Sequence, residues 1–428
     1  MAQKFYDCVA AFLRDIIPAM NKTSVFLSAS LILLLLSFAC GDGEKKPNPF
    51  GVESELVTDA GFPAYFAFAP DGRLFYGEHE TGNIRVVTSD GQLQAEPFAH
   101  VDVLIGTEWG LTGLALDPDF EKNRYVYVFY TALVDVDASI GRPTVTRFTD
   151  VDNRGVDPQV IVEDLPETDV AVTQYNANGS IHFGPDGFLY ITIGNYDNDD
   201  QGPGGKPFPQ DLSTPIGKML RVDKKDGAAA PDNPFVDQPE ADPRIFAYGF
   251  RDNFDFAFHP QTGQIYGTDN TPFSCEELNL ITKGASYGWP FGEFPYSDCQ
   301  AGGGSKAIHL FASEGTEPEN FLSPPGVTGL AFVSGDVYPL LGDSLLVCER
   351  FAGKERTTGL MRRLALSGDN LDQVLSDDVV VEDCKLGIAV SPDGIVYYGN
   401  ETEIRRLVPL PVETPKVETP EKETPDKE

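Results

Sequence analysis

The sequence predicts an all-β protein that folds as a six-bladed β-propeller. One pattern recurs along the chain: an apolar strand, a tight turn containing Pro, Asp or Gly, and a second apolar strand. The strands are rich in Phe, Tyr, Val and Ile, which favour half-buried sheet positions, and Asp-Gly turns are typical of hairpins. Hairpins that recur every roughly 50–70 residues indicate propeller blades rather than a sandwich. The six copies span residues 64–78, 111–131, 179–195, 255–270, 327–350 and 386–400.

The composition suits one large domain and excludes two classes of partner. The chain has 428 residues with 42 Gly and 33 Pro, and so many turn-forming residues are typical of many short strands. Asp and Glu total 66 against 32 Lys and Arg, which gives a formal charge of −34. A surface this acidic repels nucleic acid and anionic lipid headgroups. It would attract divalent cations, although solubility is the simpler reason for the charge as a whole.

The N-terminal residues have the order of a bacterial lipoprotein signal peptide. Lys22 precedes an apolar run over residues 25–38, and a small residue and Cys40 follow it. The run is shorter than the about 20 residues that a membrane span needs. We therefore expect residues 1–39 to be a signal peptide, with Met20 as an alternative start, and Cys40 to carry a lipid. The protein would then be exported and held at a bacterial membrane, periplasmic or at the cell surface, only by that lipid. A plain signal peptide cut nearby is the alternative.

Two segments of low apolar content flank the folded body. Residues 40–51 hold the lipidated cysteine and a short polar linker, and residues 52–408 contain all six hairpins. The tail over residues 409–428 repeats a Glu-Thr-Pro unit and has almost no apolar side chains. Such a segment cannot bury enough surface to offset the entropy of ordering, so we expect it to be disordered.

Export allows the four cysteines of the body to be interpreted as disulfides. Four cysteines permit three pairings. We favour Cys275–Cys299 and Cys348–Cys384 because each closes the shorter loop. Buried free thiols are the alternative.

The connectivity of the hairpins predicts where a ligand would bind. If all the Asp-Gly-type turns lie at one face of the disc, the residues that precede each first strand and follow each second strand meet at the opposite face. Ligands of propellers usually bind at one such face, over the central channel. The residues gathered there would be Glu78, His79, Glu108, Trp109, Asn176, Asn195, Arg251, Asp252, Asn270, Thr271, Glu349, Arg350, Cys384 and Asn400.

Several segments of the body are characteristic of a single protein family when they occur together in this order. They are EWGLTGLALDPDFEKNRYVYVFYT (108–131), SIHFGPDGFLYITIGN (180–195), QDLSTPIGKMLRVD (210–223) with PDNPF (231–235), and the run over residues 245–290. In this combination the chain resembles the glucose/sorbosone dehydrogenase family, over about residues 60–405. The resemblance implies a propeller that holds pyrroloquinoline quinone (PQQ) and calcium over its channel. It also implies oxidation of a sugar hydroxyl or hemiacetal, in which a base takes the hydroxyl proton while hydride passes to the quinone.

The resemblance implies a catalytic set that departs from the family pattern. The family's basic His aligns with Asn176 and an Asp aligns with Asn195, and an amide has no useful basicity. The family Arg is kept as Arg251, and its neighbour, usually Asn, is Asp252. His79 is the one histidine that hairpin geometry places near the ligand face, where it could replace the missing base. An exposed loop histidine is the plainer interpretation.

The cofactor-binding set also departs from the family. The basic residues that hold the PQQ carboxylates in relatives align with Phe351 or its neighbours, Cys384 and Leu386. Arg350 and Lys385 lie next to these positions and could substitute for them, since an anionic cofactor needs basic partners. Glu108 completes the predicted cofactor site, and it could act as a base if burial raises its pKa.

The positions that correspond to the family's calcium ligands match this sequence better than the catalytic and PQQ-binding positions do. Backbone carbonyls matching Thr271 and Pro272 bind the calcium beside PQQ, and a structural calcium uses acids matching Glu276 and Glu277 and a carbonyl matching Tyr287. Oxygen ligands of this kind suit Ca²⁺. The alternative is that the two glutamates are solvated loop acids.

Three functions follow from these observations. The first is oxidation of an aldose with PQQ and calcium at an atypical site. The second is a catalytically silent, calcium-bound propeller that binds a glycan or a protein at the cell surface. The third, by fold analogy alone, is a calcium-dependent lactonase-like hydrolase.

The acidic run YDNDD (196–200) is interpreted as a solvated turn and His182 as a satisfied core residue. The sugar, the electron acceptor and the oligomeric state stay open.

Overall fold

The computed structural model describes residues 48–106, 108–169, 175–177, 179–271, 275–291, 299, 303–311, 325–352 and 357–411. The chain divides into two compact units, and all described residues except Asn48 belong to the second one, Pro49–Glu428. The expected signal peptide, Cys40 and the expected disordered tail beyond residue 411 lie outside the described residues, as does Pro272. No helix within the described ranges has the length and apolar character needed to cross a membrane.

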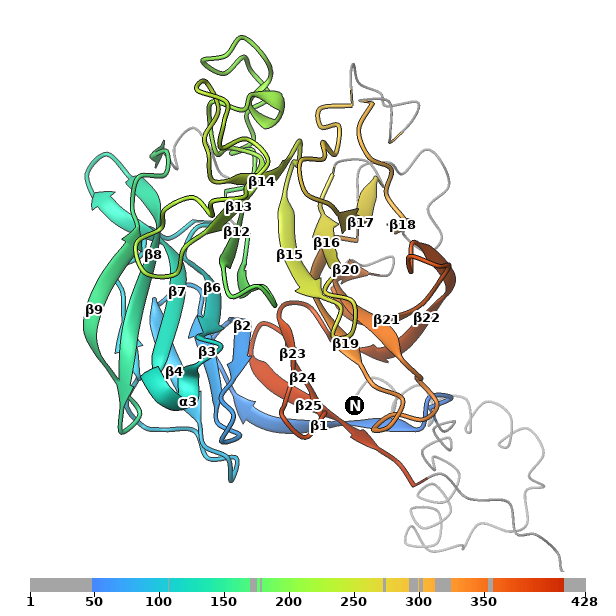
Figure 1. Cartoon of the computed structure of the whole chain (residues 1–428). Helices are drawn as coiled ribbons and strands as arrows, with labels where there is room; N and C mark the ends of the chain where they lie inside the picture. Colours follow the sequence, from blue (N-terminus) through green and yellow to red (C-terminus); the bar gives the residue numbers. More distant parts are fainter. Residues whose placement is uncertain are drawn as a thin grey trace, which may run out of the picture. The chain divides into compact units, whose positions relative to one another are not determined.

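Six antiparallel sheets form six blades, as Figure 1 shows. The first holds β2 (Pro63–Phe68), β3 (Leu74–Glu78), β4 (Asn83–Val87) and β5 (Ala99–His100), and the second holds β6 (Leu111–Leu116), β7 (Tyr125–Asp135), β8 (Ile140–Val151), β9 (Arg154–Val162) and β10 (Thr168–Asp169). The third holds β11 (Ile181–Phe183), β12 (Leu189–Ile193), β13 (Lys218–Val222) and β14 (Ile245–Tyr248), and the fourth holds β15 (Asn253–Phe258), β16 (Ile265–Asp269), β17 (Glu276–Ile281) and β18 (His309–Phe311). The fifth holds β19 (Val327–Val333), β20 (Ser344–Ala352), β21 (Thr358–Ser367) and β22 (Gln373–Glu382), and the sixth holds β23 (Ile388–Val390), β24 (Val396–Gly399), β25 (Glu403–Pro409) and β1 (Val52–Asp59). Helical structure in the described ranges is limited to α3 (Phe120–Asn123) and the 3-10 turn η2 (Phe208–Gln210).

The predicted fold class is confirmed, because each predicted hairpin forms the two inner strands of one blade. The inner strands contact one another in the order β2, β6, β11, β15, β19 and β23, and β23 contacts β2 again. The ring is closed by the N-terminal strand β1, which pairs with β25 and completes the sixth blade. A closed ring leaves only short sheet edges to protect from other chains.

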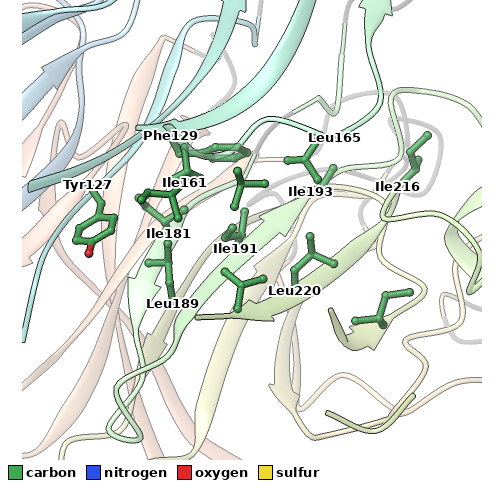
Figure 2. Packing of buried hydrophobic residues seen from close by; sticks show 14 of the residues in the cluster. Tyr127, Phe129, Ile161, Leu165, Ile181, Leu189, Ile191, Ile193, Ile216 and Leu220 are labelled. Atoms are coloured by element: carbon green, nitrogen blue, oxygen red, sulfur yellow. The ribbon is translucent and has the colours of Figure 1, made fainter. Parts of the chain in front are cut away.

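Packing between neighbouring blades supplies the core. Figure 2 shows the cluster between the second and third blades, where Phe129 of β7 lies close to Ile181 of β11 and Ile191 of β12. All five residues of β12 are buried. An unbroken apolar run is expected for such a strand, since both of its faces are covered. Burial of each large aliphatic side chain contributes about 1.5–3 kcal/mol to the free energy of unfolding.

Both cysteine pairs are disulfides in the structure. The Cα atoms of Cys275 and Cys299 lie 5.4 Å apart, and those of Cys348 and Cys384 lie 5.2 Å apart. The second bond joins β20 of the fifth blade to the segment that precedes β23 of the sixth. It therefore ties two blades together at the face where a ligand is expected.

Candidate functional site

Hydrogen bonds between neighbouring blades bring the central predicted residues together. The backbone N–H of Asn195, which follows β12, donates to the carbonyl of Arg251, which precedes β15 (2.7 Å). The backbone N–H of Asn176, ahead of β11, donates to the carboxylate of Glu108, ahead of β6. Four predicted residues from three consecutive blades thus meet at the end of the channel away from the hairpin turns.

Two other residues of the predicted face have structural partners within their own blades. Glu78 accepts hydrogen bonds from Thr81 (2.7 Å) and Asn83 (3.0 Å). Glu349 is buried and accepts from Nε of Arg362 at 2.6 Å. These bonds account for both carboxylates without any ligand.

An amide pair stands where the family resemblance places a catalytic His and its Asp. Nδ2 of Asn176 donates to Oδ1 of Asn195 at 2.9 Å, and both side chains are buried. Asn176 has a φ of 55°, in the left-handed region that Asn tolerates better than most residues. Because neither amide can accept a proton at neutral pH, any base must come from another residue.

The acidic run after β12 contributes to the site, which the sequence analysis missed. Asp199 accepts hydrogen bonds from Nδ2 of Asn195 (2.8 Å) and from Nε1 of Trp289 (2.6 Å). Asp197 lies 3.7 Å from the guanidinium of Arg251. The run lies in a turn, as expected, but these two acids also bind site residues. The available signal was the position of the run, directly after the second strand of the third hairpin.

Arg251 is fixed at the junction of the third and fourth blades. Its guanidinium donates to the carbonyl of Asn270 (3.0 Å) and lies over the ring of Trp289, 5.7 Å from the ring centre. Its backbone N–H donates to Asp269. The side chain is 19% exposed, so a ligand at this face can reach a cation whose position is already set.

Buried carboxyl groups accumulate beside Arg251. Burial raises the pKa of Asp252 well above its usual range, and the neighbouring carboxylate of Glu108 raises it further. Burial also raises the pKa of Glu108, while the N–H of Asn176 and the guanidinium groups of Arg251 and Arg350 oppose the rise. Oδ1 of Asp252 is buried without a hydrogen-bond partner in the described part of the chain. Asp252 is therefore a buried acid that favours its neutral form.

Replacing this acid by its amide should stabilise the protein. In calcium-free buffer with a chelator, Asp252→Asn is expected to raise the free energy of unfolding at pH 7 by about 1–3 kcal/mol, because the native Asp252 must take up a proton or bury its charge on folding and Asn does neither. The pKa of Asp252 is higher in the folded state than in the unfolded state. As pH rises, the unfolded state therefore loses its proton first, and Asp252 destabilises the folded protein increasingly above pH ~4. The gain should therefore vanish near pH 4 in urea titrations. Asp237→Asn, at an exposed position, is the matched control; an equal gain there would contradict the explanation.

His79 is buried, so the interpretation of it as an exposed loop residue is wrong. It is 6% exposed, its Nδ1 lies 3.1 Å from the carbonyl of Leu111, and its ring packs on Phe62. Burial lowers the pKa of His79 to about 4; the cation of Arg350 adds to the lowering, and the Leu111 carbonyl opposes it. A histidine held neutral in this way is a weak base, which argues against His79 as the replacement.

A second cationic group lies where the fifth and sixth blades meet. Arg350 lies 3.6 Å from Glu401, and Nζ of Lys385 lies 3.2 Å from the other oxygen of the same carboxylate. Nε of Arg350 is buried and has no hydrogen-bond partner among the described residues. Arg350 and Lys385 thus share the single carboxylate of Glu401, and the Nε–H of Arg350 has no acceptor among the described residues. These residues therefore fit an anionic group such as a PQQ carboxylate, with the Cys348–Cys384 disulfide beside them.

The predicted calcium ligands are buried rather than solvated. Glu276 and Glu277 are 1% and 2% exposed, so their interpretation as solvated loop acids is wrong. Thr271 is also buried, and the hydroxyl of Tyr287 donates to the carbonyl of Leu280 (2.7 Å). Four of the five predicted calcium positions are therefore buried, and Pro272 lies outside the described residues.

The donor set near Glu276 fits a cation that also takes carbonyl ligands. Oε2 of Glu276 is buried without a hydrogen-bond partner in the described part of the chain. Burial raises the pKa of Glu276, and it raises the pKa of Glu277 to about 8. No three His, Cys, Asp or Glu side chains of the described ranges converge into a metal site. Calcium would therefore need backbone oxygens in addition to Glu276, as Ca²⁺ commonly accepts.

The fold defines a six-bladed β-propeller with a polar site at one end of its channel. The family model described as Glucose / Sorbosone dehydrogenase matches residues 61–408, and the chain belongs to this family. The aldose sugar dehydrogenase YliI of Escherichia coli is 26% identical over 359 residues, which are 82% of this chain and 90% of that protein. Quinoprotein glucose dehydrogenase B of Acinetobacter calcoaceticus is 28% identical over 298 residues, 62% of this chain and 58% of that protein. A crystal structure from Thermus thermophilus, described as an oxidoreductase (glucose dehydrogenase), shares 28% identity with a TM-score of 0.67 and covers 84% of this chain and 100% of that one.

Proposed function

We propose that the protein oxidises an aldose or a related sugar with PQQ and calcium, at a site whose base is not a histidine. The proposal is carried by one observation: Glu108, Arg251 and Asn176 lie close together at one end of the channel. A carboxylate there lies against the backbone of the residue that aligns with the family's basic His. Family membership supplies the reaction class.

Glu108 is the residue that we assign as the base. Its side chain is partly exposed, whereas His79 and Asp252 are buried. Burial raises the pKa of Glu108 toward the range in which a carboxylate is a useful base. In this assignment Glu108 takes the hydroxyl proton of the sugar, and the carbon that carries the hydroxyl gives up a hydride.

The cofactors would be held by residues that flank this base. Arg350 and Lys385 would bind carboxylates of PQQ, and Arg251 would stabilise charge that develops on the reacting oxygens. The calcium beside PQQ would be bound by the carbonyls of Thr271 and Pro272, and a structural calcium by Glu276, Glu277 and the carbonyl of Tyr287. Bound PQQ would supply the hydride acceptor, polarised by the calcium.

PQQ binding by the purified protein in the presence of calcium tests the proposal. We expect saturable binding in calorimetry, with reduction of the quinone absorbance after an aldose is added. Arg350→Gln should weaken PQQ binding by about tenfold or more, because the left-over Nε donor is lost. Arg406→Gln, which removes an exposed Arg paired to Glu55, should leave binding unchanged. No binding at high micromolar PQQ would refute the proposal.

A second function is favoured by the amide pair. If Asn176 and Asn195 only bind a sugar, the protein is a catalytically silent, calcium-bound propeller for a glycan or a protein at the cell surface. A sugar that binds the calcium-loaded protein without reducing added PQQ would support this function.

Adding a lactone to the same preparation checks the third candidate, a calcium-dependent lactonase-like hydrolase, because ring opening releases a titratable acid.

Export and anchoring remain proposals from the sequence. We infer that Cys40 is the first residue of the mature protein and carries a lipid. A mass spectrum of the membrane-associated protein should then show diacylglycerol on Cys40. An unmodified N-terminus at a nearby residue would indicate a plain signal peptide instead.

A further inference from the structure

The opposite end of the channel, at the hairpin turns, holds a cavity of about 590 Å³. This turn-end cavity is lined by the last residues of all six inner strands, from Phe66–Phe68 in β2 to Ile388–Val390 in β23. Its volume falls in the range of about 300–1,000 Å³ that is typical of small-molecule sites. None of the residues assigned to sugar, PQQ or calcium lines it.

A repeat in the sequence creates this space. Five of the six inner strands place an alanine between two large apolar residues just before the turn. In the first blade the triplet is Phe66-Ala67-Phe68, and in the fourth it is Phe256-Ala257-Phe258. The small methyl groups leave room that larger side chains would fill. The alanines are Ala67, Ala115, Ala257, Ala331 and Ala389.

A stacked pair of aromatic rings lies along the channel between the turn-end cavity and the site at the other end. Tyr65 of the first blade and Phe254 of the fourth are stacked with their ring centres 6.1 Å apart. These blades lie opposite each other in the ring, so the two rings meet across the channel. They lie deeper along β2 and β15 than the lining residues and shallower than Asp252. The stack therefore lies between the turn-end cavity and the site that contains Arg251 and Glu108.

His182 carries the one polar side chain among the lining residues described by the structure. Its Nε2 lies 2.8 Å from the carboxylate of Asp255 and 3.2 Å from the hydroxyl of Ser180, and its ring packs edge-on against Phe256. The residue is satisfied, as the sequence analysis expected, but its side chain is 35% exposed instead of belonging to the core. With the proton of the neutral ring on Nε2, donated to Asp255, Nδ1 is left as an acceptor.

We propose that the turn-end cavity binds a small, uncharged aromatic or alicyclic molecule that carries one hydrogen-bond donor for Nδ1 of His182. Aromatic and aliphatic walls favour an apolar ligand through the surface that it removes from water. The lining contains no Lys, Arg, Asp or Glu among the described residues, so a charged ligand would lose its hydration without gaining a partner. The formal charge of −34 disfavours an anion further.

N-phenyl-1-naphthylamine tests the proposal directly, because it is uncharged, aromatic and carries a single N–H. We expect its fluorescence to rise with one saturable site per chain, and indole to compete for that site. Ala257→Phe and Ala389→Phe, from two different blades, should each weaken binding by about tenfold or more. Ala365→Phe is the matched control, since Ala365 is half-buried on β21 and does not line the cavity.

Thermal unfolding of each variant shows that it is folded, and Ala257→Val replaces any variant that is not. Binding that does not saturate, or equal affinity of the folded cavity variants and the control, would overturn the proposal. The result is independent of the proposed function, because no residue assigned to sugar, PQQ or calcium lines the turn-end cavity. PQQ titrations of the same variants should be unchanged. A protein that binds the probe and not PQQ would refute the proposed oxidation and leave this site in place.

Discussion

Glu108→Gln is expected to lower the rate of sugar oxidation by about 10²–10⁴-fold, the usual contribution of a general base. Gln has nearly the same shape and can still meet the N–H of Asn176 through its amide oxygen. PQQ binding should therefore change little, and the loss should fall on kcat. The measurement is the rate of quinone reduction in the PQQ- and calcium-loaded protein.

The pH profile distinguishes a base from a residue that only shapes the site. Burial raises the pKa of Glu108, so kcat/KM of the natural protein should fall on the acid side at a pH above the ordinary Glu value of about 4.3. Glu108→Gln should remove that acid limb. Glu96→Gln, at an exposed position, should keep both the rate and the limb. An unchanged rate in Glu108→Gln would show that the base lies elsewhere.

Replacing the amide pair by a base and its partner should restore activity that Glu108→Gln has removed. In that background, the double variant Asn176→His/Asn195→Asp is expected to raise the rate of quinone reduction by about 10²-fold or more. The two native side chains already contact each other at 2.9 Å, so the carboxylate introduced at position 195 would be placed to orient the new imidazole. His is also among the residues that tolerate the left-handed φ of 55° at position 176.

The single variants are the controls for this restoration. Asn176→His alone should recover less than the pair, because its imidazole lacks a carboxylate partner. Asn195→Asp alone should recover nothing, since it supplies no base in contact with the sugar and places another acid beside Asp199. Equal activity in all three variants would show that this position no longer faces the reacting hydroxyl.

The architecture of the propeller could be predicted from the amino-acid sequence alone. The two inner strands of each blade form a local hairpin within about 25 consecutive residues, so this pattern can be recognised without knowledge of the neighbouring blades. The pairing of Cys348 with Cys384 also followed from chain distance, and the structure joins the same two residues. The placement of Asn176, Asn195 and Arg251 at one face followed from connectivity, because strand ends alternate between the two faces of a propeller.

The protonation state of the site residues depends on contacts between blades, which the sequence does not reveal. His79 follows a strand, Asp252 precedes one and Glu276 begins one, and exposed polar residues also occupy such positions. Burial gives these three residues shifted pKa values, and burial depends on neighbouring blades that are far away in the sequence. The sharing of Glu401 by Arg350 and Lys385 is likewise a contact between two blades. The turn-end cavity exists because six short segments meet around one axis. The spacing of its alanines in the sequence therefore does not by itself reveal the cavity.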